Sequence, residues 1–223
     1  GNFATVAEVR VALKTARIWG HPVPQLGLPP VHAAIHDAEG KSMVVEFVGG
    51  EMKVYDNPMG ILTNSPPFDW QIANLGNYLN LRPQGPDPTA FQGVNLASPG
   101  QGGGFLGLPG DWTPPSRFVK ITTCLRFAKQ AMNSVEAVNL AEHLLNSVDI
   151  PLGIMRDPGK ETGDYTQWTL IKDLTQKVFY FRSYHDLVLK MIDLKKLRLD
   201  QDIKKSLPLD LQKGYVDSTS LLL

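Results

Sequence analysis

The chain has 223 residues, with 22 lysines and arginines against 22 aspartates and glutamates, so its formal net charge at pH 7 is zero. Balanced charge argues against nucleic acid or an anionic membrane surface as the main partner, because both bind positively charged surfaces. No apolar run approaches the roughly 20 residues that span a bilayer. The single cysteine, Cys124, excludes an internal disulfide and a cysteine-rich zinc site.

The first residues predict a helix and not a signal peptide. Thr5 is a suitable N-cap, Glu8 is its capping-box partner three residues later, and apolar residues follow at helical spacing to about Ala16. Because Gly1 stands directly before this helix, we expect the chain to begin inside a longer protein. These residues leave the compartment unknown.

Apolar residues that alternate with polar ones predict an antiparallel meander after a proline-broken stretch. Gly49-Gly50 is a typical two-residue hairpin turn inside it. His32 and His36 share one face of the first strand, but no third ligand is near them in sequence, so we expect no metal site. The four expected strands cover residues 31–36, 41–48, 51–55 and 59–62.

The fourth strand breaks at Thr63-Asn64-Ser65, before two prolines. Pro66 and Pro67 cannot donate ladder hydrogen bonds, so the strand must stop at about Ser65. Asn64 is therefore expected at a strand end, with its amide directed into a loop. Such a residue is either a turn former or a polar group that takes part in chemistry, and this stretch alone leaves both interpretations open.

A helix over 68–79 is followed by a long region rich in proline and glycine, 82–115. Loops of this length are usually functional or interfacial. Residues 102–107 match Gly-x-Gly-x-x-Gly, but no strand precedes them and Pro109 follows, so nucleotide binding is a remote alternative. The glycines are expected to allow close backbone approach or to form a cover over a site, around residues 100–107.

A second helical region begins near Thr113 and is expected to reach Met132. Arg117 lies in its first turn, where a cation is disfavoured by the helix dipole, which suggests a specific partner. Cys124 lies in the middle of this helix and is interpreted as core packing, not as a nucleophile. Ser134 is expected to cap a further helix.

Three more strands are predicted near the C-terminal end, and residues 195–223 form a polar tail that either wraps the surface or frays. Sheets separated by a helical layer indicate a layered α+β architecture. No Gly-x-Ser-x-Gly motif supports a serine triad. The three expected strands cover residues 166–172, 177–182 and 187–192.

Two sequence blocks resemble the choloylglycine hydrolase family, which comprises bile salt hydrolases and penicillin V acylases. The first is Asn57-Pro58-Met59-Gly60-Ile61-Leu62-Thr63-Asn64-Ser65-Pro66. The second is Gly107-Leu108-Pro109-Gly110-Asp111-Trp112-Thr113-Pro114-Pro115-Ser116-Arg117-Phe118. Both occur in order with a long loop between them, and the resemblance extends over essentially the whole chain.

The resemblance implies an N-terminal nucleophile hydrolase with a four-layer αββα sandwich, of which residues 1–223 would be one partial domain, incomplete at its N-terminus. In that family the nucleophile is a cysteine exposed as the mature N-terminus. Cys124 does not match it, so the resemblance implies that the nucleophile lies outside this chain. It further implies a homo-oligomer, a tetramer in the family, in the bacterial cytoplasm or periplasm, with no cofactor.

Two site residues carry over from the resemblance. Asn64 matches the asparagine that helps to hold the oxyanion, and Arg117 matches the arginine beside the nucleophile. The physics is consistent, because a side-chain amide can stabilise a developing oxyanion and a guanidinium favours thiolate over thiol. If both assignments are right, the two side chains, 53 residues apart, should reach one cleft.

The leading hypothesis is therefore the C-terminal portion of a cysteine amidase that cleaves a linear amide in a conjugated bile acid or penicillin V. Long-chain N-acyl lactones are a further substrate class that an apolar pocket would suit. The alternative is a non-catalytic fragment or family member that acts as a binding or assembly module. The upstream sequence separates the two, and this chain alone is predicted to be inactive.

Overall fold

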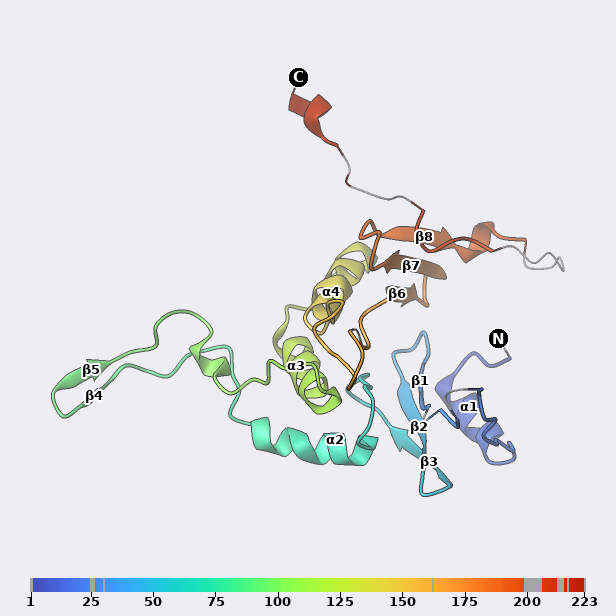
Figure 1. Cartoon of the computed structure of the whole chain (residues 1–223), viewed down its shortest axis with the longest axis horizontal. Helices are drawn as coiled ribbons and strands as arrows, with labels where there is room; N and C mark the ends of the chain where they lie inside the picture. The colour runs from blue at the N-terminus through green and yellow to red at the C-terminus, as the bar shows by residue number, and fades with distance from the viewer. Residues whose placement is uncertain are drawn as a thin grey trace. The chain divides into compact units, whose positions relative to one another are not determined.

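The computed structural model describes residues 2–24, 27–29, 31–161, 163–198, 206–211, 215 and 217–222. The chain divides into two compact units, Gly1–Lys129 and Gln130–Leu223 (Figure 1). Both units contain helices and antiparallel sheets, in agreement with the expected mixture of α and β structure. The expectation that residues 1–223 form one partial domain stays a prediction.

Three antiparallel strands form the sheet of the first unit in the order β1 (Ala33–His36), β2 (Ser42–Val48) and β3 (Glu51–Asp56). Gly49 and Gly50 join β2 to β3, and both have positive φ, as this hairpin turn requires. The first three strands of the expected meander are confirmed.

Helix α1 (Val6–Leu13) covers one face of this sheet. Val6 packs there against Met43 and Val45, which alternate along β2. The Thr5 side chain accepts a hydrogen bond from the Glu8 amide and the Glu8 carboxylate accepts one from the Thr5 amide, so the predicted capping box is confirmed. The helix ends three residues before the expected Ala16.

Helices α2 (Phe68–Leu75) and α3 (Pro114–Phe127) cover the other face. Val44 of β2 packs against Phe68 and Phe118, and the two phenylalanine rings meet edge to face. This core fixes the starts of α2 and α3 against the same strand. The helix expected over 68–79 is α2 followed by the 3₁₀ turn η1, Gly76–Tyr78.

The prediction that the helix of Arg117 reaches Met132 is wrong. Helix α3 ends at Phe127, and Ala128 has an extended backbone. The first compact unit ends at Lys129, so Met132 has no core of that unit to pack into and is largely exposed. The apolar pattern in the sequence continues past Phe127, where the helix ends, and this is why the prediction was too long.

The strand expected over 59–62 is also wrong, because these residues form an irregular turn. Gly60 has a positive φ of 66°, which no strand residue adopts, and its amide donates to the Asn57 carbonyl. The buried Asn57 side chain donates in turn to the Ile61 carbonyl. Asn57 therefore holds the segment as a compact loop that still buries Ile61.

The long region over 82–115 contains structure that the sequence did not predict. Strands β4 (Thr89–Phe91) and β5 (Val94–Leu96) form an exposed hairpin, which projects from the rest of the first unit in Figure 1. A Cβ at Gly104 would lie 2.1 Å from the Gln84 carbonyl oxygen, so the expectation of close backbone approach is confirmed there. A 3₁₀ turn, η2, covers Gly103–Phe105.

The second unit places helix α4 (Ser134–Asn146) beside an antiparallel sheet of β6 (Trp168–Asp173), β7 (Val178–Ser183) and β8 (Lys190–Asp193). Asn133, not the expected Ser134, caps α4 and accepts a hydrogen bond from the Glu136 amide. Each strand begins one to three residues later than predicted, but the hairpin turn between β6 and β7 falls where the sequence indicated.

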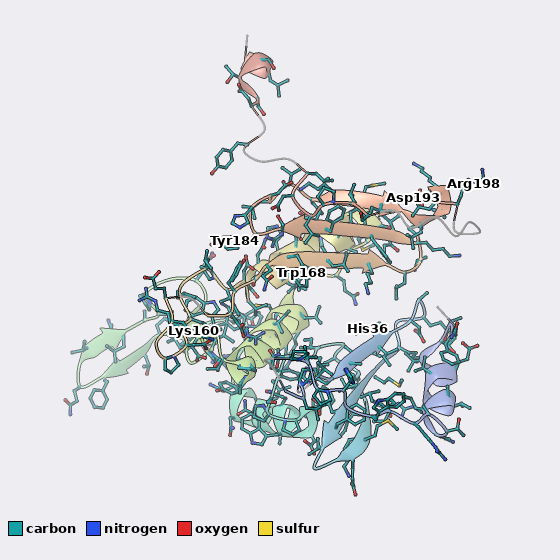
Figure 2. All side chains as sticks on the ribbon, turned by 45° about the vertical axis from the view of Figure 1, so that its right-hand side comes forward. His36, Lys160, Trp168, Tyr184, Asp193 and Arg198 are labelled. Carbon is teal, nitrogen blue, oxygen red and sulfur yellow. The ribbon has the colours of Figure 1, made fainter. Side chains whose placement is uncertain are left out.

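One face of this sheet carries exposed aromatic and aliphatic side chains. Trp168, labelled in Figure 2, is 56% exposed and Leu170 is 44% exposed. Leu207 and Leu209 of the tail line a pocket of about 320 Å³ together with this face. Parts of the tail over 195–223 lie outside the described residues, namely 199–205, 212–214, 216 and 223.

Candidate functional site

Asn64 lies in the exposed loop that joins the 57–62 turn to α2, directly before a cis Ser65–Pro66 bond. The Gln71 side chain fixes this loop from α2, since its Nε2 donates to the carbonyls of Asn64 and Pro66, at 3.3 Å each. Gln71 is only 1% exposed. A buried helix side chain therefore sets the position of the Asn64 backbone.

Arg117 lies in the first turn of α3, and two contacts tie this turn to its surroundings. The Thr63 hydroxyl donates to the Pro114 carbonyl at 3.1 Å, which joins the first sequence block to the second. The Arg117 Nε donates to the Trp112 carbonyl at 3.0 Å, so the guanidinium folds back over the start of the helix.

The structure brings the two predicted site residues together, because Nη2 of Arg117 donates to Oδ1 of Asn64 at 2.6 Å. A guanidinium has only donors, so the amide oxygen must be the atom that faces it. The Nδ2 group of Asn64 is then on the other branch of the amide, as a donor for a second partner.

The charge of Arg117 is only weakly compensated. Partial burial lowers the pKa of its guanidinium from the ordinary value, although an arginine stays protonated at neutral pH. Within the part of the chain that the structure describes, no carboxylate lies at ion-pair distance from it. A half-buried cation whose contacts are neutral oxygens favours the approach of an anion.

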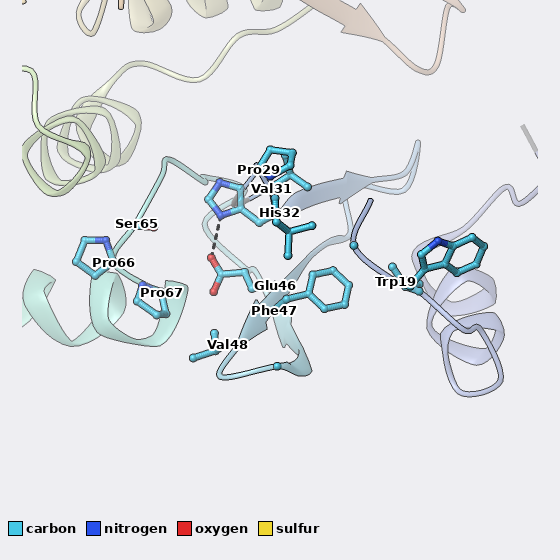
Figure 3. Close-up of a pocket in the computed structure, with 14 residues that line it drawn as sticks. Trp19, Pro29, Val31, His32, Glu46, Phe47, Val48, Ser65, Pro66 and Pro67 are labelled. Atoms are coloured by element: carbon cyan, nitrogen blue, oxygen red, sulfur yellow. Dashed lines mark hydrogen bonds and ion pairs between the residues drawn. The ribbon is translucent and has the colours of Figure 1, made fainter. Parts of the chain in front are cut away.

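A pocket of about 470 Å³ lies in the first unit, next to the residues that follow Asn64 in the sequence (Figure 3). Ser65, Pro66 and Pro67 form part of its wall, and the rest is largely apolar. His32 meets Glu46 there, with 3.2 Å between Nδ1 and Oε1. The residues that line it are Ile18, Trp19, Gly20, Leu28, Pro29, Val31, His32, Glu46, Phe47, Val48, Gly50, Ser65, Pro66 and Pro67.

The histidine pair considered for a metal does not act together. His32 contacts Glu46, whose second oxygen accepts the Phe68 amide at 2.8 Å, whereas His36 lies near Gly60. No group of three or more potential metal ligands occurs among the described residues. None of the helices described is both long enough and apolar enough to cross a membrane. The absence of a cofactor and of a membrane partner remain predictions.

Cys124 is half-buried in the interior of α3. It follows Arg117 by seven residues, which is about 10 Å along a helix axis. That spacing separates its thiol from the Asn64–Arg117 contact and agrees with its interpretation as packing.

The glycine-rich segment is anchored away from this contact. The Phe105 ring lies 5.7 Å from the ring of Phe127, at the other end of α3 from Arg117, and the Gly104 carbonyl accepts the Arg82 amide. These contacts argue against the expectation that residues 100–107 roof Asn64 and Arg117.

Sequence reasoning missed two groups that shape the site. Gln71 looked like any polar residue on a helix, and only its burial beneath the Asn64 loop distinguishes it. The role of the Trp112 carbonyl cannot be read from the sequence, because every residue at that position would have a backbone carbonyl. The long-range link between Thr63 and Pro114 likewise appears only in the folded chain.

Comparison with known proteins gives consistent matches along the chain. The sequence profile described as linear amide C-N hydrolases, choloylglycine hydrolase family, matches residues 1–207. Bile salt hydrolase/transferase of Clostridium perfringens is 38% identical over 89% of this chain and 60% of its own length. The enzyme of the same name from Lactiplantibacillus plantarum is 33% identical over 96% of the chain and 66% of its own length.

Solved structures extend these matches. A variant of conjugated bile acid hydrolase from Clostridium perfringens superposes with a TM-score of 0.83 at 34% identity, over 96% of this chain and 66% of that one. Penicillin V acylase from Agrobacterium tumefaciens gives a TM-score of 0.64 at 24% identity, over 88% of this chain and 53% of that one, which is a likeness of fold alone. The chain thus spans about two thirds or less of the length of these relatives.

Proposed function

The chain belongs to the choloylglycine hydrolase family, and on that premise we propose that it is the C-terminal portion of an amidase that cleaves a linear amide bond. The observation that carries the proposal is the 2.6 Å contact between Arg117 and Asn64, which joins the first turn of α3 to a loop 53 residues earlier in one polar site. The proposed substrates are conjugated bile acids or penicillin V, as the names of the relatives suggest.

In this proposal Asn64 donates to the oxyanion. Its Oδ1 is held by Arg117, so its Nδ2–H group meets the carbonyl oxygen of the substrate as negative charge develops there. Gln71 holds the loop in place before the reaction, which reduces the reorganisation that the transition state would need.

Arg117 stabilises the nucleophile as an anion. The proposed nucleophile is an N-terminal cysteine outside this chain. A half-buried guanidinium that has no carboxylate at ion-pair distance among the described residues would lower the pKa of a nearby thiol. The thiolate then attacks the amide carbon, the C–N bond breaks and the amine leaves with a proton, so that the acyl group is held as a thioester. Water hydrolyses this thioester in a second step, which releases the carboxylic acid and restores the thiol. Cys124 takes no part.

The finer fold is also a proposal, namely a four-layer αββα sandwich that a portion outside this chain completes. Support comes from the second unit, where α4 packs on one face of the sheet while Trp168 and Leu170 stay exposed on the other. An apolar sheet face requires a partner layer. The isolated chain should therefore fold poorly or self-associate, which light scattering would measure, and a monomeric sample at high concentration would contradict this.

The test is hydrolysis by the complete protein of glycocholate, taurocholate and penicillin V. We expect turnover of at least one of them, its loss when the N-terminal cysteine is replaced by alanine, and no change in Cys124→Ala. An upstream sequence without a cysteine, or the absence of turnover on all linear amides tried, would instead favour the binding or assembly module.

A second prediction concerns the 223-residue chain by itself. It should hydrolyse none of these substrates, because the proposed nucleophile lies outside this chain. Turnover by the purified chain that persists in the Cys124→Ala variant would contradict the assignment of the nucleophile to a separate portion.

A further inference from the structure

We propose that Asp111 is a positioning residue for Arg117. Its carboxylate closes the segment before α3 into a fixed turn, and the carbonyl inside that turn holds the guanidinium against Asn64. The inference rests on the function proposed above, because it adds a residue to the same site.

The carboxylate of Asp111 joins three donors around the start of α3. Its Oδ1 accepts the Thr113 amide at 2.9 Å and the Thr113 hydroxyl at 2.6 Å. Its Oδ2 accepts the Ser116 hydroxyl at 2.7 Å. Because Ser116 is buried in the first turn of the helix, the carboxylate ties the preceding loop to the helix itself.

Trp112 lies inside the turn that this carboxylate closes. Its carbonyl accepts the Arg117 Nε at 3.0 Å, while the Arg117 amide donates to the Thr113 carbonyl at 2.9 Å. The guanidinium is thus held at two points, the Trp112 carbonyl and Oδ1 of Asn64. Without the carboxylate the Trp112 peptide can rotate, and one of these two points is lost.

Charge supports the same arrangement. Helix α3 has no acidic residue in its first turn, yet it carries Arg117 there, where a cation is disfavoured. Asp111 supplies a negative charge just before that helix end. The hydrogen bonds from Thr113 and Ser116 lower the pKa of its carboxyl to about 2, so it is ionised throughout the neutral range.

The chain contains a matched control. Asp217-Ser218-Thr219 repeats the local pattern, because Asp217 Oδ1 accepts the Thr219 amide at 2.9 Å, and its pKa is also lowered. Six residues after Asp217, at the position that Arg117 occupies relative to Asp111, the sequence has Leu223. Asp217→Asn therefore makes the same chemical change without a guanidinium that depends on it.

The experiment measures how fast phenylglyoxal modifies Arg117 in the complete protein, by peptide mass spectrometry, with Arg126 of the same helix as internal reference. Asp111→Asn and Asp111→Ala should raise the ratio of the two rates by roughly tenfold, the scale of losing a hydrogen bond to a charged group. Ser116→Ala should give a smaller rise and Asp217→Asn none.

Kinetics provide the second readout. Asp111→Asn should lower kcat while KM stays within about twofold, because the guanidinium is displaced where charge develops. If Asp111→Ala fails to fold, the labelling ratio and kcat of Ser116→Ala and Asp111→Asn test the inference. An unchanged Arg117 labelling ratio in a folded Asp111→Asn variant would overturn the inference. A raised ratio in a protein without amidase turnover would keep the positioning role and reject the proposed function.

Discussion

Two arginines in this protein make the same contact in different electrostatic settings. Arg182 in β7 donates from Nη2 to Oδ1 of Asn146, as Arg117 does to Oδ1 of Asn64. Arg182 is only 5% exposed and its Nε also donates to the carboxylate of Glu142 at 2.9 Å. The Nε of Arg117 meets a neutral carbonyl instead.

The two arginines differ in whether a carboxylate of the same chain neutralises the guanidinium. Burial of an arginine is costly unless a carboxylate compensates it, and Glu142 does so for Arg182 inside the second unit. Among the described residues no carboxylate compensates Arg117 in this way. Asn146 also ends a helix, whereas Asn64 lies in a loop held by Gln71.

The largest effect on stability should follow from breaking the compensated pair. Glu142→Ala leaves Arg182 buried without its counter-ion and should destabilise the second unit by about 3–5 kcal/mol. Denaturant unfolding measures it. The exposed pair of Lys160 and Asp157 is the control, since Asp157→Ala should cost no more than about 1 kcal/mol. If Glu142→Ala and Asp157→Ala lowered the unfolding free energy equally, the Glu142–Arg182 pair would have no special importance for stability.

Replacing Asn64 should lower activity strongly and change stability little, the reverse of what is expected for Glu142. Asn64→Ala should lower kcat of the complete protein by about 10²–10³, or roughly 2.7–4 kcal/mol, as loss of an oxyanion donor does. Its unfolding free energy should change by no more than about 0.5 kcal/mol, because the side chain is exposed. Asn95→Ala in β5 is the matched control, and an equal loss of kcat there would exclude a specific role for Asn64.

Gln71 should combine both kinds of effect. Gln71→Ala removes the buried donor to the Asn64 and Pro66 carbonyls and should cost about 1–3 kcal/mol of stability. It should also lower kcat, since the loop that carries Asn64 loses its anchor. The control is Asn77→Ala, an exposed amide just after the same helix. Unchanged kcat in a destabilised Gln71→Ala protein would limit Gln71 to folding.

Sequence alone predicted the parts of the fold that local patterns govern. The Thr5–Glu8 capping box, the Gly49-Gly50 hairpin and the strands around them depend on neighbours in the chain. The family resemblance predicted Asn64 and Arg117 as site residues. The structure shows that the two side chains are in contact, and their role stays a prediction.

The features that sequence missed depend on distant contacts or on one unusual backbone angle. The strand predicted over 59–62 was wrong because the positive φ of Gly60 turns this apolar run, and the Asn57 side chain donates to the Ile61 carbonyl. The β4–β5 hairpin has short, exposed strands without a strong alternating pattern. Gln71 is recognisable only once α2 is packed beneath the loop of Asn64.

The smallest expected effect is the dependence of stability on pH through the Asp111 carboxyl. The pKa of the Asp111 carboxyl is lowered from 3.8 to about 2, so its contribution to stability is present above pH 3.8 and is lost as the pH falls through about 2. Melting temperatures of the natural protein and of Asp111→Asn should differ at pH 5 and converge toward pH 2. A difference that is constant across this range would contradict the role of the ionised carboxylate.

The role of Asn64 as oxyanion donor is best tested by a crystal structure of the complete protein, with its N-terminal nucleophile replaced by alanine and a linear amide substrate bound. We expect Nδ2 of Asn64 to lie within about 3.1 Å of the substrate carbonyl oxygen, with Arg117 still hydrogen-bonded to Oδ1. A carbonyl oxygen bound elsewhere, at more than roughly 10 Å from Asn64, would contradict it.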